Sequence, residues 1–183
     1  MHSIDDRDRP FAPHSHDVDG QDTTTLVGVT DADFDWMLGG VRPEGRHYNL
    51  APGGVDDDAV LEIVRGMTRA LHRAACSGSW LIVAGGEVVG LCSYKRPPSG
   101  GEVEIGYGIA KSRRGLGHAS RAVAAMLTEC ANDDAVQVVV AQTSVTNVAS
   151  QRVLEKNAFQ KAGERADPED GDLFTWSKVV IRT

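Results

Sequence analysis

Cysteine is scarce in this chain of 183 residues, and so is any pattern that would hold a metal ion. The three cysteines, Cys76, Cys92 and Cys130, lie far apart, with no CxxC pair and no metal-ligand spacing. Three histidines stand within the first 16 residues, but no cysteine or second cluster accompanies them. We therefore expect no metal site, and we interpret the cysteines as small buried side chains in a reducing compartment.

The chain also has few positively charged residues and only short apolar runs. Lys and Arg number 19 against 26 Asp and Glu, which gives a formal net charge of -7 at pH 7. Because nucleic-acid affinity depends on clustered Lys and Arg, this balance argues against a nucleic-acid partner. No apolar run approaches the ~20 residues of a membrane-spanning helix, and no signal-type hydrophobic segment stands at the N-terminus. We expect a soluble, cytoplasmic protein without a membrane partner.

Residues 1–22 differ in composition from the rest of the chain. They hold six Asp, two Arg and two Pro with almost no aliphatic side chains. Such a segment buries too little apolar surface to offset the entropy lost on ordering. We expect a flexible acidic tail at 1–22 and a single domain at 23–183, since 41% hydrophobic residues can fill one ordinary core.

The residues after the tail alternate between strand and helix patterns. A capping box of Thr30 and Asp33 opens a short helix, and the Gly85-Gly86 pair suits a two-residue hairpin. In chain order we expect a strand at 23–29, helices at 31–38 and 56–75, strands at 80–84, 87–94 and 102–110, a helix at 117–131, a strand at 136–141, a helix at 148–157 and closing strands near 159–163 and 174–181. This order predicts a mixed α/β sheet with helices on both faces.

The long helix at 56–75 carries one apolar stripe at helical spacing. Its members are Val60, Val64, Met67, Leu71 and Ala74. We expect this stripe to face the core.

The stretch SRRGLGHAS, residues 112–120, joins a strand to a helix. Gly115 and Gly117 remove side chains where the backbone must approach something closely, and the first helical turn leaves N–H groups unpaired. Together with the helix dipole these donors form an anion pocket, and Arg113 and Arg114 add charge suited to phosphate. The stretch is either a phosphate-binding loop or a plain turn into a helix.

Two well-known phosphate motifs do not fit this stretch. The Walker pattern GxxxxGK[ST] is absent from the chain. The dinucleotide fingerprint GxGxxG/A matches Gly115 and Gly117, with Ser120 in its third position, but it belongs after the first strand of a parallel unit with an acid about 20 residues on. Here three or more strands come first and the following strand ends without an acid. We therefore do not expect a nicotinamide site.

Three segments together resemble the GCN5-related N-acetyltransferase (GNAT) superfamily, particularly its RimJ/RimL-like branch of protein N-terminal acetyltransferases. They are EIGYGIA at 104–110, RRGLGHAS at 113–120 and TNVASQRVLEKNAF at 146–159. In that family the backbone amides of a Q/R-x-x-G-x-G/A loop hold the pyrophosphate of acetyl-CoA. The resemblance implies acetyl-CoA as co-substrate, held by the loop residues Arg114, Gly115, Leu116, Gly117, His118 and Ala119.

The resemblance also implies the GNAT fold, a mostly antiparallel sheet with a V-shaped splay between its central strands. The strand ending at Ile109 and Ala110 would diverge from its neighbour after Gln142, and the pantetheine arm would lie in the gap, paired with backbone near Ile109. A backbone N–H near Gly108 or Ile109 would polarise the thioester carbonyl. A primary amine, from a protein N-terminus or a small molecule, would attack directly in a ternary complex.

Four features depart from the family pattern. Ser112 occupies the usual Gln or Arg place in the loop, and Leu154 occupies the place of a common catalytic tyrosine. Asn157-Ala158 replaces the common Leu-Gly before Phe159, which suggests a slightly different turn there. Gly108 stands where the branch frequently carries a bulky aromatic residue, and its small size would widen the acceptor side.

Glu104 is the first candidate for the general base and Glu102 the second. Strand alternation puts both on one face, and a carboxylate part-way down an apolar strand can take a proton from an ammonium. The alternative for each is a salt-bridged or rim carboxylate. Ser150 is the candidate proton donor near the sulfur, as its branch suggests, or only a hydrogen-bonding residue at a helix start, while Asn147 would cap that helix and contact the pantetheine arm.

Other residues receive more ordinary interpretations. We expect His118 to face solvent or the nucleotide rather than to catalyse, and Tyr107 to be a packed strand residue. Trp36 is either a core residue or a wall of the acceptor pocket. The loop EGRHYNLAPGG at 44–54 is the expected specificity element, since binding residues favour mobile loops on a rigid frame.

Two rivals to an N-acetyltransferase remain open. One is a non-catalytic acyl-CoA-binding module that senses the cofactor, and the other is transfer of a longer acyl group. Glu104 and Ser150 favour catalysis over the sensor. A homodimer is plausible for this family.

Overall fold

The computed structural model describes residues 23–168 and 171–181. Its elements in chain order are β1 (Thr24–Gly28), α1 (Asp31–Met37), β2 (Asn49–Leu50), α2 (Asp58–Arg73), β3 (Ser79–Ala84), β4 (Glu87–Tyr94), β5 (Glu102–Ile109), the 3-10 turn η1 (Lys111–Arg113), α3 (His118–Ala131), β6 (Val138–Ser144), α4 (Val148–Lys156), β7 (Gln160–Asp167) and β8 (Gly171–Val179). The predicted flexible tail at 1–22 lies outside the described residues.

The strands form one eight-stranded sheet in the order β1-β3-β4-β5-β6-β8-β7, with the short β2 paired to β4. Neighbours along the sheet are antiparallel except β5 and β6, and β2 runs parallel to β4. The mixed, mostly antiparallel α/β sheet expected from the sequence is confirmed. β2 escaped prediction because two residues carry no periodic pattern and only their pairing with β4 defines them.

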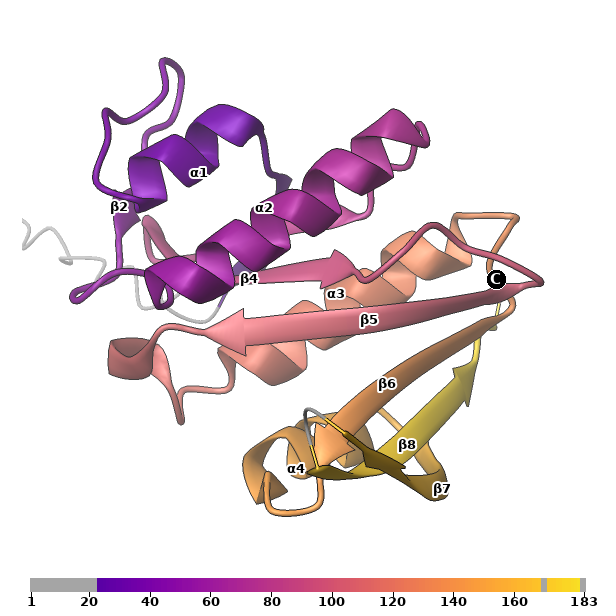
Figure 1. Ribbon diagram of the computed structural model, residues 1–183. Coiled ribbons are helices and arrows are strands. Elements are labelled where there is room, and N and C mark those ends of the chain that lie inside the picture. The colour runs from indigo at the N-terminus through magenta and orange to yellow at the C-terminus, as the bar shows by residue number, and fades with distance from the viewer. Residues whose placement is uncertain (1–22, 169–170, 182–183) are drawn as a thin grey trace, which may run out of the picture.

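The central strands β5 and β6 pair over three residues only, Glu102–Glu104 with Val138–Val140. Beyond that point β5 stays with β4 through Ile109, while β6 stays with β8 through Ser144. Figure 1 shows the two strands meeting at one end and diverging toward η1 and α4. The predicted V-shaped splay is therefore present.

Helices cover both faces of the sheet (Figure 1). On one face, Phe34 of α1 and Leu61 of α2 pack in a buried cluster with side chains of β3 and β4. On the other, Val123 of α3 and Leu154 of α4 pack in a larger cluster that includes Val139 of β6. Within the described ranges, no helix is long and apolar enough to cross a bilayer.

The buried stripe of α2 is rotated from the predicted one. Leu61, Thr68 and Leu71 are buried, whereas Val60 is 40% exposed. Of the five predicted residues Leu71 is fully buried and Val64 packs half-buried against the core, whereas Val60 and Ala74 are exposed, so the predicted stripe was right only in part. Thr68 lies inside because its hydroxyl shares a hydrogen bond of 2.7 Å with Ser79 on β3, a tertiary contact that the pattern of apolar residues does not contain.

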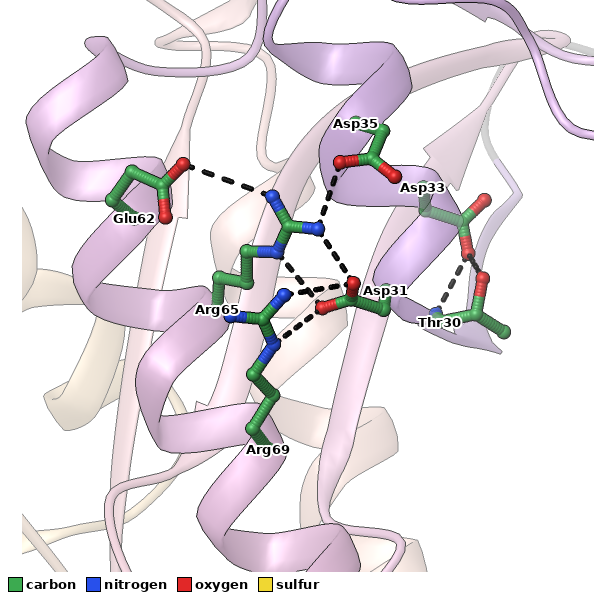
Figure 2. Close-up of polar contacts among 7 residues, drawn as sticks. All are labelled: Thr30, Asp31, Asp33, Asp35, Glu62, Arg65 and Arg69. Atoms are coloured by element: carbon green, nitrogen blue, oxygen red, sulfur yellow. Dashed lines mark hydrogen bonds and ion pairs between the residues drawn. The ribbon is translucent and has the colours of Figure 1, made fainter.

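Ion pairs fix α1 against α2 (Figure 2). Asp31 accepts hydrogen bonds from both Arg65 and Arg69, and Arg65 also reaches Asp35 at 2.7 Å. Hydrogen bonds from the two arginines hold the pKa of Asp31 far below its usual range. α2 therefore turns its arginines to α1, which accounts for the rotation of its buried face.

The capping box that opens α1 is formed as predicted. Thr30 donates its backbone N–H to Asp33 at 2.7 Å and its hydroxyl at 2.8 Å. Asp33 is fully buried and also accepts two hydrogen bonds from Arg46. Burial by itself would raise the pKa of Asp33, but the hydrogen bonds from Arg46 and Thr30 outweigh it and hold the pKa below its ordinary value.

Candidate active site

The loop before α3 has the backbone of a close-approach site. Gly115 and Gly117 have φ of +78° and +81°, a left-handed conformation that a side chain would strain. Gly117 is the N-cap of α3 and offers no side chain to cap it. An anion bound beside the loop would therefore meet the positive end of the α3 dipole.

Side chains around the loop fix its shape. Arg113 donates two hydrogen bonds to Glu87 on β4, at 2.7 and 3.1 Å, and these hold the pKa of Glu87 below its ordinary value. Ser112, in the usual Gln or Arg place, donates its hydroxyl to the carbonyl of Pro52 at 2.7 Å. Arg113 is therefore a loop anchor, since its charge is matched by a carboxylate and not held free for phosphate.

A cavity of about 480 Å³ joins this loop to the splayed strands and α4. Among the predicted site residues, it is lined by Ile109, Arg114, Gly115, Gly117, Ala119, Asn147 and Ser150. These residues come from three segments that are distant in sequence. The structure therefore brings most of the predicted cofactor site together around one space.

Three predicted cofactor residues do not line the cavity. Ala110 is 1% exposed and donates its backbone N–H to β4, and Leu116 is a 57% exposed residue at the tip of the loop. His118 is 7% exposed, with Nδ1 3.2 Å from the hydroxyl of Thr24. The expectation that the His118 side chain faces solvent or nucleotide is wrong, because the first turn of α3 packs beside β1 and buries it.

Backbone groups of β5 point into the splay. Lys95 donates its N–H to the carbonyl of Glu104 at 2.8 Å, which fixes the phase of the β4–β5 ladder. Since alternate residues of an antiparallel strand bond to the same neighbour, Gly108 faces β4, while the N–H groups of Tyr107 and Ile109 turn away from it. Of the two oxyanion donors that the resemblance suggested, the Ile109 N–H is the one directed at the gap.

The start of α4 closes the opposite side of the cavity. Asn147 caps the helix as predicted, since its side-chain oxygen accepts the N–H of Ser150 at 3.0 Å. Tyr107 donates its hydroxyl to the Ser150 carbonyl at 3.2 Å, and burial raises the pKa of Tyr107 to about 12. The Ser150 hydroxyl has no hydrogen-bond partner among the residues that the structure describes.

Two charged cavity residues on α4 were missed from the sequence. Arg152 and Lys156 line the space, and neither has an ion pair or hydrogen bond within the described part of the chain. Their spacing of four residues places them on one helix face, a signal that could have found them once the helix was predicted. They supply the uncompensated positive charge that Arg113 does not.

Glu104 lies in a different setting from the cavity. Its carboxylate is 7% exposed and pairs with Lys95 at 3.1 Å and Arg96 at 3.8 Å. This is the salt-bridged carboxylate that the sequence left open as an alternative. Glu102 is exposed near the paired ends of β5 and β6.

The residues around the expected specificity loop are held firmly. Arg46 bonds to Asp33 and to the carbonyl of Gly28, and Pro52 accepts the hydrogen bond of Ser112. The loop at 44–54 is thus tied to α1 on one side and to the cavity loop on the other. Trp36, on α1, is a core residue in the buried cluster that also holds Leu61 of α2.

The turn after α4 is the one a glycine would make. Ala158 has φ of +58°, and Phe159 donates its N–H to the Leu154 carbonyl at 3.0 Å. Together with the Ala158 N–H bonded to Glu155, this is a Schellman motif with alanine in the glycine position. The expected change of turn is therefore absent, and the backbone keeps the glycine-type conformation.

Known proteins share the fold of this chain. Residues 24–160 match the family model described as Acetyltransferase (GNAT) domain. No curated protein matches the chain significantly. RimJ from Mycobacterium smegmatis, in complex with a CoA disulfide, superposes with a TM-score of 0.63 and 21% identity over 85% of this chain and 81% of its own.

Two further solved structures have a similar fold. The Microcin C7 self-immunity acetyltransferase MccE, in complex with acetyl-CoA and AMP, gives a TM-score of 0.63 and 15% identity over 87% of this chain and 93% of its own. RimL, a ribosomal L7/L12 alpha-N-protein acetyltransferase in complex with coenzyme A, gives 0.58 and 22% over 69% and 75%. The fold expected from the RimJ/RimL-like segments is confirmed by these structures.

Proposed function

Because this chain belongs to the GNAT acetyltransferase family, we propose that it transfers an acetyl group from acetyl-CoA to a primary amine. The observation that carries the proposal is the cavity of about 480 Å³ that runs from the glycine loop to the splay between β5 and β6. Such a space matches a ligand with phosphates at one end and an extended arm at the other.

The loop and α4 would hold the phosphates of acetyl-CoA. Gly115 and Gly117 bring the backbone close without side chains, and the uncapped start of α3 favours an anion. Arg152 and Lys156 supply charge from across the cavity, and Arg114 lines it from the loop side. These features fit a pyrophosphate because each offers a donor or a positive charge.

The splay would hold the pantetheine arm and the thioester. The Ile109 N–H, turned away from β4, would donate to the thioester carbonyl oxygen and stabilise the charge that develops there. Asn147 would keep α4 in place, and the Ser150 hydroxyl would assist protonation of the departing sulfur. When bound, acetyl-CoA supplies the activated acetyl group.

The acceptor would be an amine-bearing group, either a protein N-terminus or a small molecule. The RimL structures are those of an enzyme that acts on a ribosomal protein, which supports a protein acceptor as one class to test. A non-catalytic sensor of acyl-CoA would bind the same ligand without releasing its thiol, so turnover separates the two.

The two cations of α4 provide the sharpest test of the cofactor site. Replacing Arg152 and Lys156 together by Ala should raise the dissociation constant of acetyl-CoA by about tenfold or more, because each charge-assisted phosphate contact contributes about 1–2 kcal/mol. Arg73→Ala removes an exposed cation at the end of α2 and is the matched control. Unchanged calorimetric affinity in the double variant would refute the phosphate assignment.

A further inference from the structure

Asp56 lies over β5 beside the splay, just before α2. Its Oδ2 is 3.2 Å from the place that a β-carbon on Gly108 would occupy. Its Oδ1 accepts the N–H of Asp57 at 2.9 Å, which orients the carboxylate. Within the described residues Oδ2 has neither a hydrogen bond nor an ion pair, whereas Asp57 is paired with Lys111 at 3.0 Å.

The face of β5 beneath Asp56 carries glycines in place of larger side chains. Gly106 and Gly108 share this face, since side chains alternate along a strand. The nearest atoms above Gly106 belong to Lys95, at 3.7 Å from a β-carbon built there. Above Gly108, Asp56 alone comes within 4 Å among the residues that the structure describes. Gly108 therefore leaves room beside the strand, and the carboxylate oxygen of Asp56 borders that room.

This room adjoins the backbone donor of the proposed reaction. Ile109 follows Gly108, and its N–H turns into the splay where the thioester carbonyl would lie. An amine that enters over Gly108 would meet Asp56 Oδ2 and the acetyl carbon together. Proximity of this kind is what a direct transfer needs.

We propose that Asp56 binds the ammonium group of the acceptor and takes its first proton. The inference rests on the proposed acetyltransferase function. The proton moves from nitrogen to Asp56 Oδ2, and the freed lone pair forms the C–N bond as the C–S bond breaks. The nitrogen then releases a second proton, which neutralises the thiolate, and Asp56 returns its proton to water.

Asp56 suits this role better than Glu104. Both oxygens of Glu104 form ion pairs, one with Lys95 and the other with Arg96. Asp56 keeps one oxygen unbonded at the strand face. The neighbouring Asp57 is neutralised by Lys111, and the Lys95 side chain lies over Gly106, two residues from Gly108 on the same face of β5.

The first experiment compares Asp56→Asn with Asp58→Asn. Asn keeps an oxygen for the Asp57 N–H, and Asp58 is an exposed carboxylate two residues away, so it serves as the control. With a panel of primary amines, Asp56→Asn should lower kcat/KM by about 100-fold or more at neutral pH. The loss should shrink above the pKa of the amine itself, because the amine is then already deprotonated, and acetyl-CoA affinity should stay unchanged.

The other possible results separate failure of this inference from failure of the proposed function. Turnover by Asp56→Asn within about twofold of the unmodified protein across pH would overturn the inference while the acetyltransferase function stands. A loss that is equal at every pH would also overturn the proton-transfer role. Binding of acetyl-CoA without turnover of any amine by the unmodified protein would refute the proposed function, and this inference with it.

A second pair of variants tests the same geometry without changing a carboxylate. Gly108→Ala places a β-carbon 3.2 Å from Asp56 Oδ2, which is closer than ordinary contact, whereas Gly106→Ala meets Lys95 at an ordinary 3.7 Å. Gly108→Ala should lower kcat/KM by several-fold and Gly106→Ala should not. Equal effects of the two variants would contradict a role for the space at Gly108.

Discussion

Replacing Ala158 by glycine should stabilise the protein, although it removes a methyl group. Ala158 ends α4 at φ of +58°, in a Schellman motif closed by the hydrogen bond from Phe159 to Leu154. Ala75 ends α2 in the same way, at φ of +55°. In both turns the backbone adopts the left-handed conformation in which a β-carbon is strained.

The size of the effect follows from two opposing terms. An L-residue in the left-handed region costs about 1–2 kcal/mol relative to glycine. Glycine offsets part of this gain, because it adds about 0.4–1 kcal/mol of conformational freedom to the unfolded chain. The free energy of unfolding should therefore rise by about 0.5–1 kcal/mol, which corresponds to about 2–3 °C in Tm for a domain of this length.

Thermal unfolding followed by circular dichroism would measure the change. Ala158→Gly and Ala75→Gly should each raise Tm, and the double variant should show roughly the sum, since the two sites lie in different helices. Ala124→Gly, at an exposed position inside α3, is the control and should lower stability by about 1 kcal/mol. Destabilisation by Ala158→Gly equal to that of Ala124→Gly would refute the reasoning.

Three further changes have defined outcomes. Asp33→Asn should cost about 2–3 kcal/mol in chemical denaturation, because it unpairs the Arg46 guanidinium at a buried site; a loss under about 0.5 kcal/mol would contradict this. The stability that Glu87 gains from Arg113 is complete above the ordinary glutamate pKa of 4.5 and is lost as pH falls, since the pKa of Glu87 is lower in the folded protein. On acidification Tm should therefore drop less in Glu87→Gln than in the unmodified protein, and parallel curves of Tm against pH for the two proteins would contradict this pairing. Gly117→Val should raise the acetyl-CoA dissociation constant by about tenfold or more with an unchanged far-ultraviolet circular dichroism spectrum, because φ of +81° excludes a branched side chain. Unaltered affinity in a calorimetric titration would refute the assignment of this loop to phosphate binding.

Local sequence signals were enough to predict the framework of the site. The loop residues Gly115 and Gly117 and the helix cap Asn147 each depend on backbone conformation within a few residues, whereas the splay of β5 from β6 was expected only from the resemblance to the GNAT superfamily. Such features are encoded by neighbours along the chain, so a short motif specifies them. The turn at Ala158 is the informative exception, because tertiary packing of α4 retains a left-handed backbone without the usual glycine.

Partner choice across the fold could not be read from the same signals. Arg113 resembles a phosphate ligand until Glu87, 26 residues earlier, is seen to bind it. Glu104 resembles a free base until Lys95 is placed beside it. The role inferred for Asp56 likewise depends on a contact with Gly108 that no local pattern contains.

Calorimetric titration of acetyl-CoA into the unmodified protein tests the central claim most directly. The account predicts saturable binding at one site per chain, with a dissociation constant below about 1 mM, the upper end of ordinary enzyme affinities for substrates. Absence of binding at that concentration would contradict it, because the loop at Gly115 and Gly117 and the cavity beside α4 would then hold no cofactor.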